Sequence, residues 1–313
     1  MRKMLSVGMG LLLAVVLAGP TAAGDYPSRP MTFMTMVQPG AQIDRLARGL
    51  AQRFSKELGQ PINVKNVTGG SHGSVMATEL SKAKPDGYTI GVAATTAYTY
   101  QPHHSPVTYK FGDFDYLTLV ALNSSGFITK SDKPWNTLKE AFQWAKKNNK
   151  ALVCMFHGAD DRDAIQRIAK KEGVKISLIP SKGGPSVIKA VTGGHADIGY
   201  VGAILYKHVE AGRIKLLASA LGIRLPPIPS VPTLKEQGYD EQVEMVVGLV
   251  APKGLPKDVT DKLLSAANKL AKSEETKTFI TKNLLMLPVT WGQGHAHKAL
   301  KDMYDTFGKQ AKK

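Results

Sequence analysis

Short apolar runs rich in β-forming residues alternate with amphipathic helical patterns along the sequence, and this alternation restricts the fold more than any other feature. Runs of this length, separated by helices, are typical of parallel sheets whose two faces are both covered. The strands predicted from these runs are residues 31–37, 62–66, 88–94, 116–122, 151–156, 176–180, 196–201, 214–220 and 245–251. We therefore predict an α/β fold with two doubly wound lobes.

The clearest helical pattern follows the first predicted strand. Apolar side chains recur there at three- and four-residue intervals, which places on one helix face Ile43, Leu46, Ala47, Leu50, Phe54 and Leu58. Further helices are predicted at residues 137–148, 161–171, 185–192, 256–271 and 295–307. Each predicted helix lies between two predicted strands or follows the last one.

Two stretches interrupt the pattern and indicate where the chain crosses between lobes. Residues 123–126 read Asn-Ser-Ser-Gly inside an extended segment, and residues 225–232 form a stiff, proline-rich surface segment. We predict a first lobe made of residues 25–125 and 233–313, and a second lobe made of residues 126–232. Two α/β lobes joined by two crossings are typical of solute receptors that close about a hinge.

Residues 1–24 have the order of a secretory signal peptide. Arg2 and Lys3 precede an apolar run at residues 4–18, and small residues follow as far as Gly24. The run is shorter than the roughly 20 residues that span a bilayer. We expect cleavage near Ala23 or Gly24, with the mature chain free in the periplasm.

The formal net charge of +16 first suggests an anionic partner such as nucleic acid. Export would leave +14, of which residues 25–125 carry +2, residues 126–232 carry +9 and residues 233–313 carry +3. The excess cations lie on the polar sides of short amphipathic patterns, without zinc-finger spacing or RNP-like aromatic residues. We expect no nucleic-acid partner and interpret the predicted second lobe as basic, suited to steer anions or to contact a membrane partner.

The predicted first lobe contains three loops where a ligand is expected, because ligands of open α/β sheets bind beyond the carboxyl ends of the strands. The first loop offers free N–H groups at a helix start to an anion, whereas its Asp44 is expected to cap the helix. The second is a glycine-rich nest suited to carboxylate oxygens, and the third is small and hydroxylic. The candidate residues are Gly40, Ala41, Gln42 and Asp44, then Gly69, Gly70, Ser71 and His72, then Thr95 and Thr96.

A fourth loop, in the predicted second lobe, contains Gly158, Ala159 and Asp160, followed by Asp161 and Asp163. Acidic residues are common at helix N-termini, so capping explains most of this pattern. At a cleft, the same acids could instead hold an ammonium group or contact the facing lobe.

Residue patterns for catalysis or for a metal are weak in this sequence. It has no GxSxG nucleophile elbow, no HExxH motif and no paired-carboxylate pattern with local specificity for catalysis. His103–His104 and His295–His297 are interpreted as exposed pairs, and Cys154 as a buried inert thiol inside an apolar run. We expect no catalytic residue, no metal and no cofactor.

Several motifs resemble, in the same order, those of the Bug-type receptors, the periplasmic solute-binding components of tripartite tricarboxylate transporters. Near the start these are Tyr26-Pro27-Ser28-Arg29-Pro30, Pro39-Gly40-x-x-x-Asp44, Leu58-Gly59-Gln60-Pro61 and Ala83-Lys84-Pro85-Asp86-Gly87-Tyr88-Thr89. Later ones are Lys182-Gly183-Gly184-Pro185, Gly193-Gly194-His195-Ala196-Asp197, Val231-Pro232-Thr233-Leu234-x-x-x-Gly238 and Gly248-Leu249-Val250-Ala251-Pro252-x-Gly254-x-Pro256. The resemblance covers nearly the whole predicted mature chain.

This resemblance implies a receptor of the type II periplasmic-binding-protein architecture. Such a receptor closes on a small organic acid and presents it to the membrane subunits of a transporter, and we expect it to be monomeric. The three loops of the first lobe would face residues 158–161 and the segment around Lys182 and Gly183. Departures from the family pattern leave the ligand open: Tyr98, Tyr200 and Phe156 suit an aromatic acid, and Asp160 suits an amino acid.

Two other functions remain as alternatives at this level. One is a receptor that signals to a membrane sensor kinase, and the other is an exported α/β hydrolase.

Overall fold

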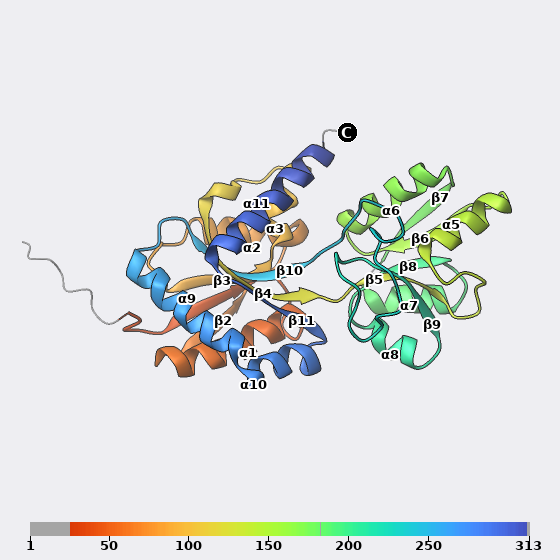
Figure 1. Cartoon of the computed structure of the whole chain (residues 1–313). Coiled ribbons are helices and arrows are strands. Elements are labelled where there is room, and N and C mark those ends of the chain that lie inside the picture. The colour runs from red at the N-terminus through yellow and green to blue at the C-terminus, as the bar shows by residue number, and fades with distance from the viewer. Residues whose placement is uncertain (1–25, 182, 312–313) are drawn as a thin grey trace, which may run out of the picture.

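The structure is a computed structural model that describes residues 26–181 and 183–311. It has two α/β lobes, each built on one sheet, and two extended crossings that lie side by side between them (Figure 1). The predicted signal peptide lies outside the described residues, as does Lys182. In the described part of the chain, no helix has both the length and the apolar character that crossing a membrane requires.

The first lobe is built on a six-stranded sheet with the order β11-β4-β10-β3-β1-β2. β10 runs antiparallel to both of its neighbours, and so does β11 to β4, whereas β1 pairs in parallel with β2 and β3. The elements before the crossing are β1 (Met31–Thr35), α1 (Gln42–Leu58), β2 (Ile62–Asn66), η1 (Ser71–Gly73), α2 (Ser74–Ser81), β3 (Thr89–Ala94), α3 (Thr96–Thr99), α4 (Gln101–His104), η2 (Phe111–Asp113) and β4 (Phe114–Asn123). Those after the return are β10 (Val246–Pro252), α9 (Lys257–Lys272), α10 (Glu274–Thr278), the π-helical turn η3 (Phe279–Asn283), β11 (Met286–Trp291) and α11 (Gln293–Gln310).

The second lobe is built on a five-stranded sheet with the order β7-β6-β8-β5-β9. β6 pairs in parallel with β7 and β8, and β5 runs antiparallel to β8 and β9. Its elements are β5 (Gly126–Lys130), α5 (Leu138–Lys147), β6 (Leu152–Phe156), α6 (Ala159–Glu172), β7 (Ile176–Pro180), α7 (Gly184–Thr192), β8 (Ile198–Val201), α8 (Leu205–Glu210) and β9 (Ile214–Ser219).

The predicted α/β class is confirmed, but the expectation of parallel sheets is wrong, because both sheets are mixed. The reversed strands β5 and β10 are those that the chain forms directly after crossing between lobes, so they enter each sheet from the opposite end. β5 and β11 were not predicted as strands. β5 directly follows the serines of the crossing, and β11 contains a proline.

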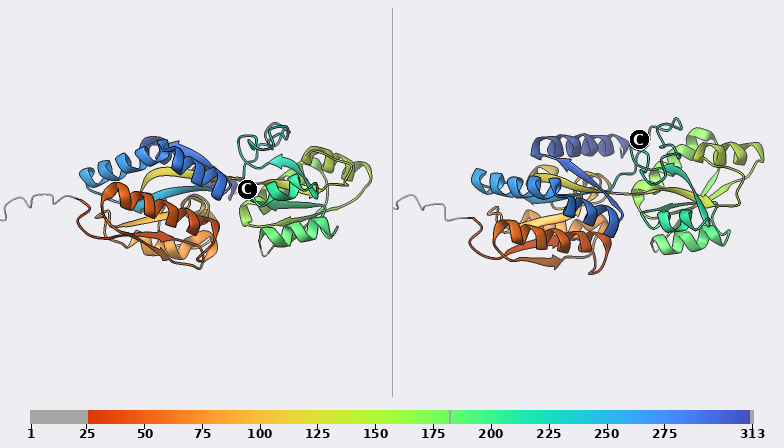
Figure 2. Two further views of the ribbon diagram at one scale, coloured as in Figure 1. Left: turned by 90° about the horizontal axis from the view of Figure 1, so that it is seen from below. Right: turned by 60° about the horizontal axis from the view of Figure 1, so that its bottom comes forward.

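Helices cover both faces of each sheet, as the short strands predicted. In the first lobe, α1 and α9 bury their apolar faces against one side of the sheet, and α2 and α11 pack on the other. The helix α1 begins and ends close to the predicted limits, and Gly59 terminates it in a left-handed conformation (φ 72°) while donating its N–H to Ser55 O. Figure 2 shows α11 lying across the first lobe with its C-terminal end toward the second.

The two crossings form a narrow connection between the lobes. Ser124 and Ser125 join β4 to β5, and residues 244–245 lead into β10. The Asn123 N–H donates to Met245 O at 2.9 Å, and the Ala220 N–H donates to Ser125 O at 3.1 Å, so backbone hydrogen bonds join the crossings to each other and to the second lobe.

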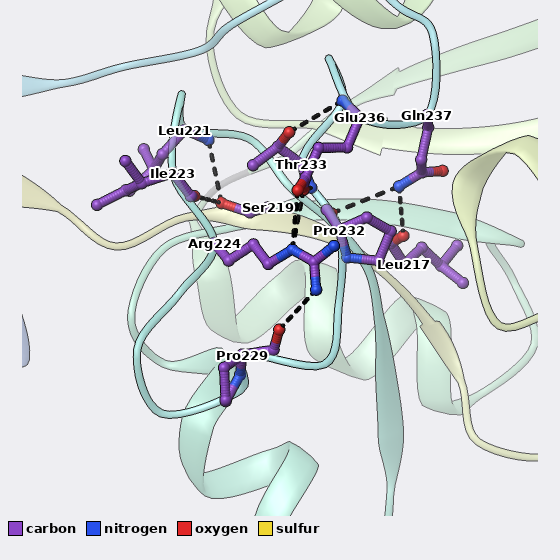
Figure 3. Close-up of polar contacts among 10 residues, drawn as sticks. All are labelled: Leu217, Ser219, Leu221, Ile223, Arg224, Pro229, Pro232, Thr233, Glu236 and Gln237. Carbon is purple, nitrogen blue, oxygen red and sulfur yellow. Dashed lines mark hydrogen bonds and ion pairs between the residues drawn. The ribbon is translucent and has the colours of Figure 1, made fainter.

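Residues 233–243 pack against the second lobe. The sequence predicted that the chain returns to the first lobe at residue 233, but the return comes later. Leu234, Tyr239 and Val243 belong to the core between that sheet and α5 and α6. Polar contacts also hold this segment (Figure 3). Thr233 and Glu236 exchange side-chain-to-backbone hydrogen bonds, and both carboxylate oxygens of Glu236 accept from Arg224 Nε at 3.0 Å.

This shift removes the predicted difference in charge between the lobes. Residues 233–244 carry Lys235 against Glu236, Asp240, Glu241 and Glu244. With them, the second lobe carries +6 instead of +9, and the first lobe rises from +5 to +8. A basic lobe facing a nearly neutral one is therefore not a property of this fold.

Candidate functional site

The carboxyl ends of β1, β3 and β4 lie at one edge of the first sheet, and the crossings to the second lobe leave from that edge. Buried polar atoms without a hydrogen-bond partner lie in or beside these ends: Thr35 Oγ1, Thr95 Oγ1 and Asn123 Oδ1. Such atoms are uncommon in protein interiors and are costly, so their alignment makes this edge the candidate functional region.

In the first candidate loop, Asp44 is held by the protein itself. Its carboxylate is 1% exposed and accepts hydrogen bonds from Gly40 N at 2.7 Å, Asn66 Nδ2 at 2.8 Å and Arg48 Nε at 3.0 Å. Burial would raise the pKa of Asp44, but these bonds outweigh it and hold the pKa below its usual value. Asp44 therefore organises the loop, in agreement with a capping role.

The other candidate residues of this loop differ in how accessible they are to a ligand. Gly40 has a left-handed φ of 84° and is exposed, and Ala41 precedes the first turn of α1. The Gln42 amide donates to Leu284 O at 2.7 Å, within the first lobe. Leu284 lies 242 residues further along the chain, and this contact uses the side-chain amide of a residue that the sequence suggested as a ligand contact.

The second candidate loop is a cluster of unusual backbone conformations. Gly69 has φ 114°, and Gly70 has φ 67° with ψ 168°, a combination that is open to glycine almost alone. His72 lies in the left-handed region at φ 49°, and its Nδ1 is 3.0 Å from Ser71 Oγ. The loop is exposed at residues 68–71, so its backbone is accessible to a ligand.

The third candidate loop packs directly beside the second. Thr95 and Thr96 are buried, and the short helix α3 that they open contacts η1. Tyr98, two residues later, is fully buried in the core against Phe114 and Tyr116 and does not line a cleft. Thr95 is thus placed at the sheet edge, whereas the aromatic side chain predicted beside it serves the core.

The candidate residues of the second lobe lie at the start of α6. Asp161 is 1% exposed and accepts hydrogen bonds from the N–H groups of His157 at 2.8 Å and Gly158. Burial, followed by the charge of Asp160, raises the pKa of Asp161 to about 7, against the effect of these N–H groups. Asp161 caps the helix, and Asp160 does not take part in this cap.

Two contacts bring the lobes together at the start of α6. His72 Nε2 lies 3.8 Å from Asp160 Oδ1, and Tyr100 Oη donates to Asp163 Oδ2 at 3.2 Å. The His72 and Tyr100 rings are 5.1 Å apart, so both contacts belong to one cluster. A Cβ placed on Gly158 would lie 3.6 Å from His72 Nε2, which shows how closely the two loops approach.

The remaining candidates of the second lobe are Gly183 and Tyr200. Gly183 adopts φ 125° directly before α7, and its N–H donates to Ser181 Oγ at 3.3 Å. Tyr200 is 7% exposed and packs edge-on against Phe127. Burial, followed by the charges of Asp160 and Asp161, raises the pKa of Tyr200.

Sequence reasoning missed the role of Tyr100, Asp163 and the hinge residue Asn123. Asp163 was visible only as one of several acids at a helix start, and Tyr100 had no distinguishing pattern. Asn123 was assigned to a crossing, but its close approach to the second lobe was not predicted. A Cβ added to Gly202 would lie only 3.2 Å from Asn123 Nδ2. Each of these contacts joins residues of different lobes.

The histidine pairs contact aromatic side chains, and the cysteine lies in the core. His104 stacks on Tyr100 at 3.6 Å between ring centroids, and His297 lies against Phe111 and Tyr116. Cys154 is fully buried, which raises the pKa of its thiol. Among the residues that the structure describes, no three His, Cys, Asp or Glu side chains come together in a way that could hold a metal ion.

Comparison with known proteins identifies the family. Residues 46–304 match the tripartite tricarboxylate transporter family receptor. The chain belongs to this family. Its members are solute-binding receptors and not enzymes, so the resemblance to Bug-type receptors is confirmed and the hydrolase alternative is excluded.

Relatives in this family span most of the chain. A protein from the gbd 5′ region of Cupriavidus necator is 32% identical, covering 79% of this chain and 76% of that protein. BugT of Bordetella pertussis is 29% identical over 81% of this chain and 80% of its own length. A ligand-free TctC solute-binding protein from Polaromonas is 25% identical and superposes with a TM-score of 0.79 over 91% of this chain and 98% of that one.

More distant structures confirm the fold. MatC of Rhodopseudomonas palustris, solved with malate, is 22% identical with a TM-score of 0.73 over 91% of this chain and all of its own. An adipate-bound protein of R. palustris is 20% identical with a TM-score of 0.76 over 92% and 98%. A sulfonate-binding protein and an L-cystine receptor share the fold at TM-scores of 0.52 and 0.51, which confirms the type II periplasmic-binding architecture.

Proposed function

We propose that this receptor captures a small carboxylate-bearing metabolite between its lobes in the periplasm. It would then deliver that ligand to the membrane subunits of a tripartite tricarboxylate-type transporter. In this proposal the receptor acts as a monomer, without a cofactor, after removal of the signal peptide near Ala23 or Gly24.

The main support is the meeting of the glycine-rich loop with the start of α6. The loop at residues 68–71 is exposed, and His72, which follows it, lies close to Gly158 and Asp160 of the other lobe. Successive N–H groups in such backbone conformations form a concave site that favours carboxylate oxygens. The unpaired hydroxyl of Thr95 lies next to this loop, where a ligand would give it a partner.

Malate and adipate in the two R. palustris structures agree with a carboxylate ligand. Both are small organic acids with carboxylate groups at two ends of the molecule.

The direct test is to identify what the protein binds. Protein purified after export would be examined by native mass spectrometry, and any released small molecule would be identified. We expect a carboxylate-bearing compound that binds again in isothermal titration calorimetry. A tightly bound ligand without a carboxylate would contradict the proposal.

Gly70→Ala tests the glycine-rich loop as the ligand site. A side chain at this backbone conformation costs about 1–3 kcal/mol, and its Cβ would lie 2.1 Å from Ser74 Oγ, so the loop must rearrange. We expect ligand affinity to fall at least about tenfold. The control is Gly112→Ala, where a Cβ meets nothing within 4 Å. Unchanged affinity in Gly70→Ala would remove this loop from the site.

A further inference from the structure

Asp160 is the acid at the start of α6 that lacks a strong partner. Its side chain is 16% exposed, and among the described residues it accepts no hydrogen bond; the closest cation-forming group is His72 Nε2 at 3.8 Å, beyond hydrogen-bond distance. A carboxylate that is largely withdrawn from water, with one distant histidine as its ion-pair partner, is unfavourable, and a cation beside it would relieve that cost.

The neighbouring acids of α6 are already engaged. Asp161 accepts two backbone N–H groups, and Asp163 accepts from Tyr100 and pairs with Arg162 at 2.7 Å. Arg162, the nearest arginine in sequence, is therefore directed to Asp163 and not to Asp160. Among the residues that the structure describes, Asp160 thus keeps its charge beside His72 alone, and this charge remains available to a ligand that enters between the lobes.

The same arrangement disfavours an anion on this side of the cleft. N–H groups at a helix start commonly bind anionic ligands, but Asp161 already occupies those that precede α6. A ligand carboxylate placed here would meet the charge of Asp160 instead. The first lobe has a different character, because its glycine-rich loop is exposed and the buried Thr95 beside it has an unpaired hydroxyl.

We propose that the receptor selects ligands that carry a protonated amino group as well as a carboxylate, with Asp160 as the residue that determines this specificity. The carboxylate binds to the first lobe, and the ammonium group lies against Asp160 of the second. Simple di- and tricarboxylic acids, which lack the cation, bind more weakly. This inference rests on the proposed function, because it assigns the ligand class of the same cleft.

The test compares acids that differ only in an amino group. Calorimetry at pH 7.5 would use L-aspartate with succinate, L-glutamate with glutarate, and L-phenylalanine with 3-phenylpropanoate. In at least one pair we expect the amino compound to bind at least about tenfold more tightly, the size expected for a charge-assisted hydrogen bond. This measurement needs no variant and is independent of any effect on folding.

Asp160→Asn keeps the shape of the side chain and removes its charge. We expect it to lower the preference for the amino compound at least about tenfold while changing affinity for the amine-free partner less than about threefold. Asp132→Asn is the matched control, because it removes one acid of the same lobe that lies at the surface, paired with Lys130.

The outcomes separate this inference from the proposed function. Tighter binding of the amine-free acid in every pair that binds, or equal discrimination by Asp160→Asn and the wild type, would overturn the role of Asp160 and leave a carboxylate receptor. Absence of binding by all six compounds would overturn this inference, whereas the proposed function is tested by the ligand that native mass spectrometry identifies.

Discussion

At the scale of single residues, the Asp44 carboxylate receives hydrogen bonds from three separate parts of the first lobe: the loop at Gly40, the helix at Arg48 and the strand end at Asn66. It thereby sets the path of the loop that leads from β1 into α1. Conformational demands act at the same scale, since Gly70 and His72 hold backbone angles that few residues adopt. The candidate loops are thus shaped by individual residues and not by regular secondary structure.

Asp44→Ala is expected to lower the free energy of unfolding by about 2–3 kcal/mol, because it leaves buried donors without their charged acceptor. Since the folded pKa of Asp44 lies below its unfolded value, this contribution is present above about pH 4 and is lost as pH falls through the folded pKa. Denaturant unfolding at pH 7 and pH 3 would measure both effects. Asp86→Ala, in a surface pair with Arg29, should cost less than about 1 kcal/mol; an equal loss in both variants would contradict this account.

At the scale of elements, the start of α6 combines three acids with different roles. Asp161 caps the helix, Asp163 contacts Tyr100 of the other lobe, and Asp160 faces His72. The sequence showed a run of acids at a helix start, and capping was the correct interpretation for one of them. The helix sets the spacing of the three acids, and contacts with the opposite lobe then give Asp160 and Asp163 their different partners.

The raised pKa of Asp161 has a measurable consequence. Between about pH 4 and pH 7 the folded carboxyl binds a proton that the unfolded one has released. Its contribution is therefore full below about pH 4 and declines as pH rises toward 7. Asp161→Asn should lose a constant amount of stability, from the weakened cap, but show a flatter decline in melting temperature from pH 5 to 8 than the wild type. Parallel curves would contradict the assignment, and Asp132→Asn provides the control.

At the scale of the whole molecule, two chain segments form the only crossings between lobes in the described residues, and a small cluster of side chains also joins the lobes. Tyr100 is central to this cluster, because it lies beside His72, stacks on His104 and contacts Phe307 of α11. Rotation about the hinge would separate Tyr100 from Asp163 while leaving the contacts of Tyr100 within its own lobe intact.

Tyr100→Phe removes the hydrogen bond to Asp163 and keeps the aromatic ring. A bond that exists only when the lobes are closed adds to ligand affinity, so we expect affinity to weaken by about 3- to 10-fold. Calorimetry with the identified ligand would measure this change. Tyr109→Phe removes a hydrogen bond to Ala97 O inside the first lobe and should lower the melting temperature without a comparable loss of affinity. Equal affinities of Tyr100→Phe and the wild type would contradict closure through this contact.

The sequence by itself determined the α/β class, most strands and helices and the family. Strands at 62–66 and 176–180 coincide with their predictions, because hydrophobic periodicity and turn residues act over a few neighbouring positions. Only the tertiary structure decided the strand directions, the late return to the first lobe with its effect on the charge of each lobe, and the partners of Gln42 and Tyr100. These features depend on contacts between residues far apart in the chain, whose pairing follows from how the lobes pack and not from any local pattern.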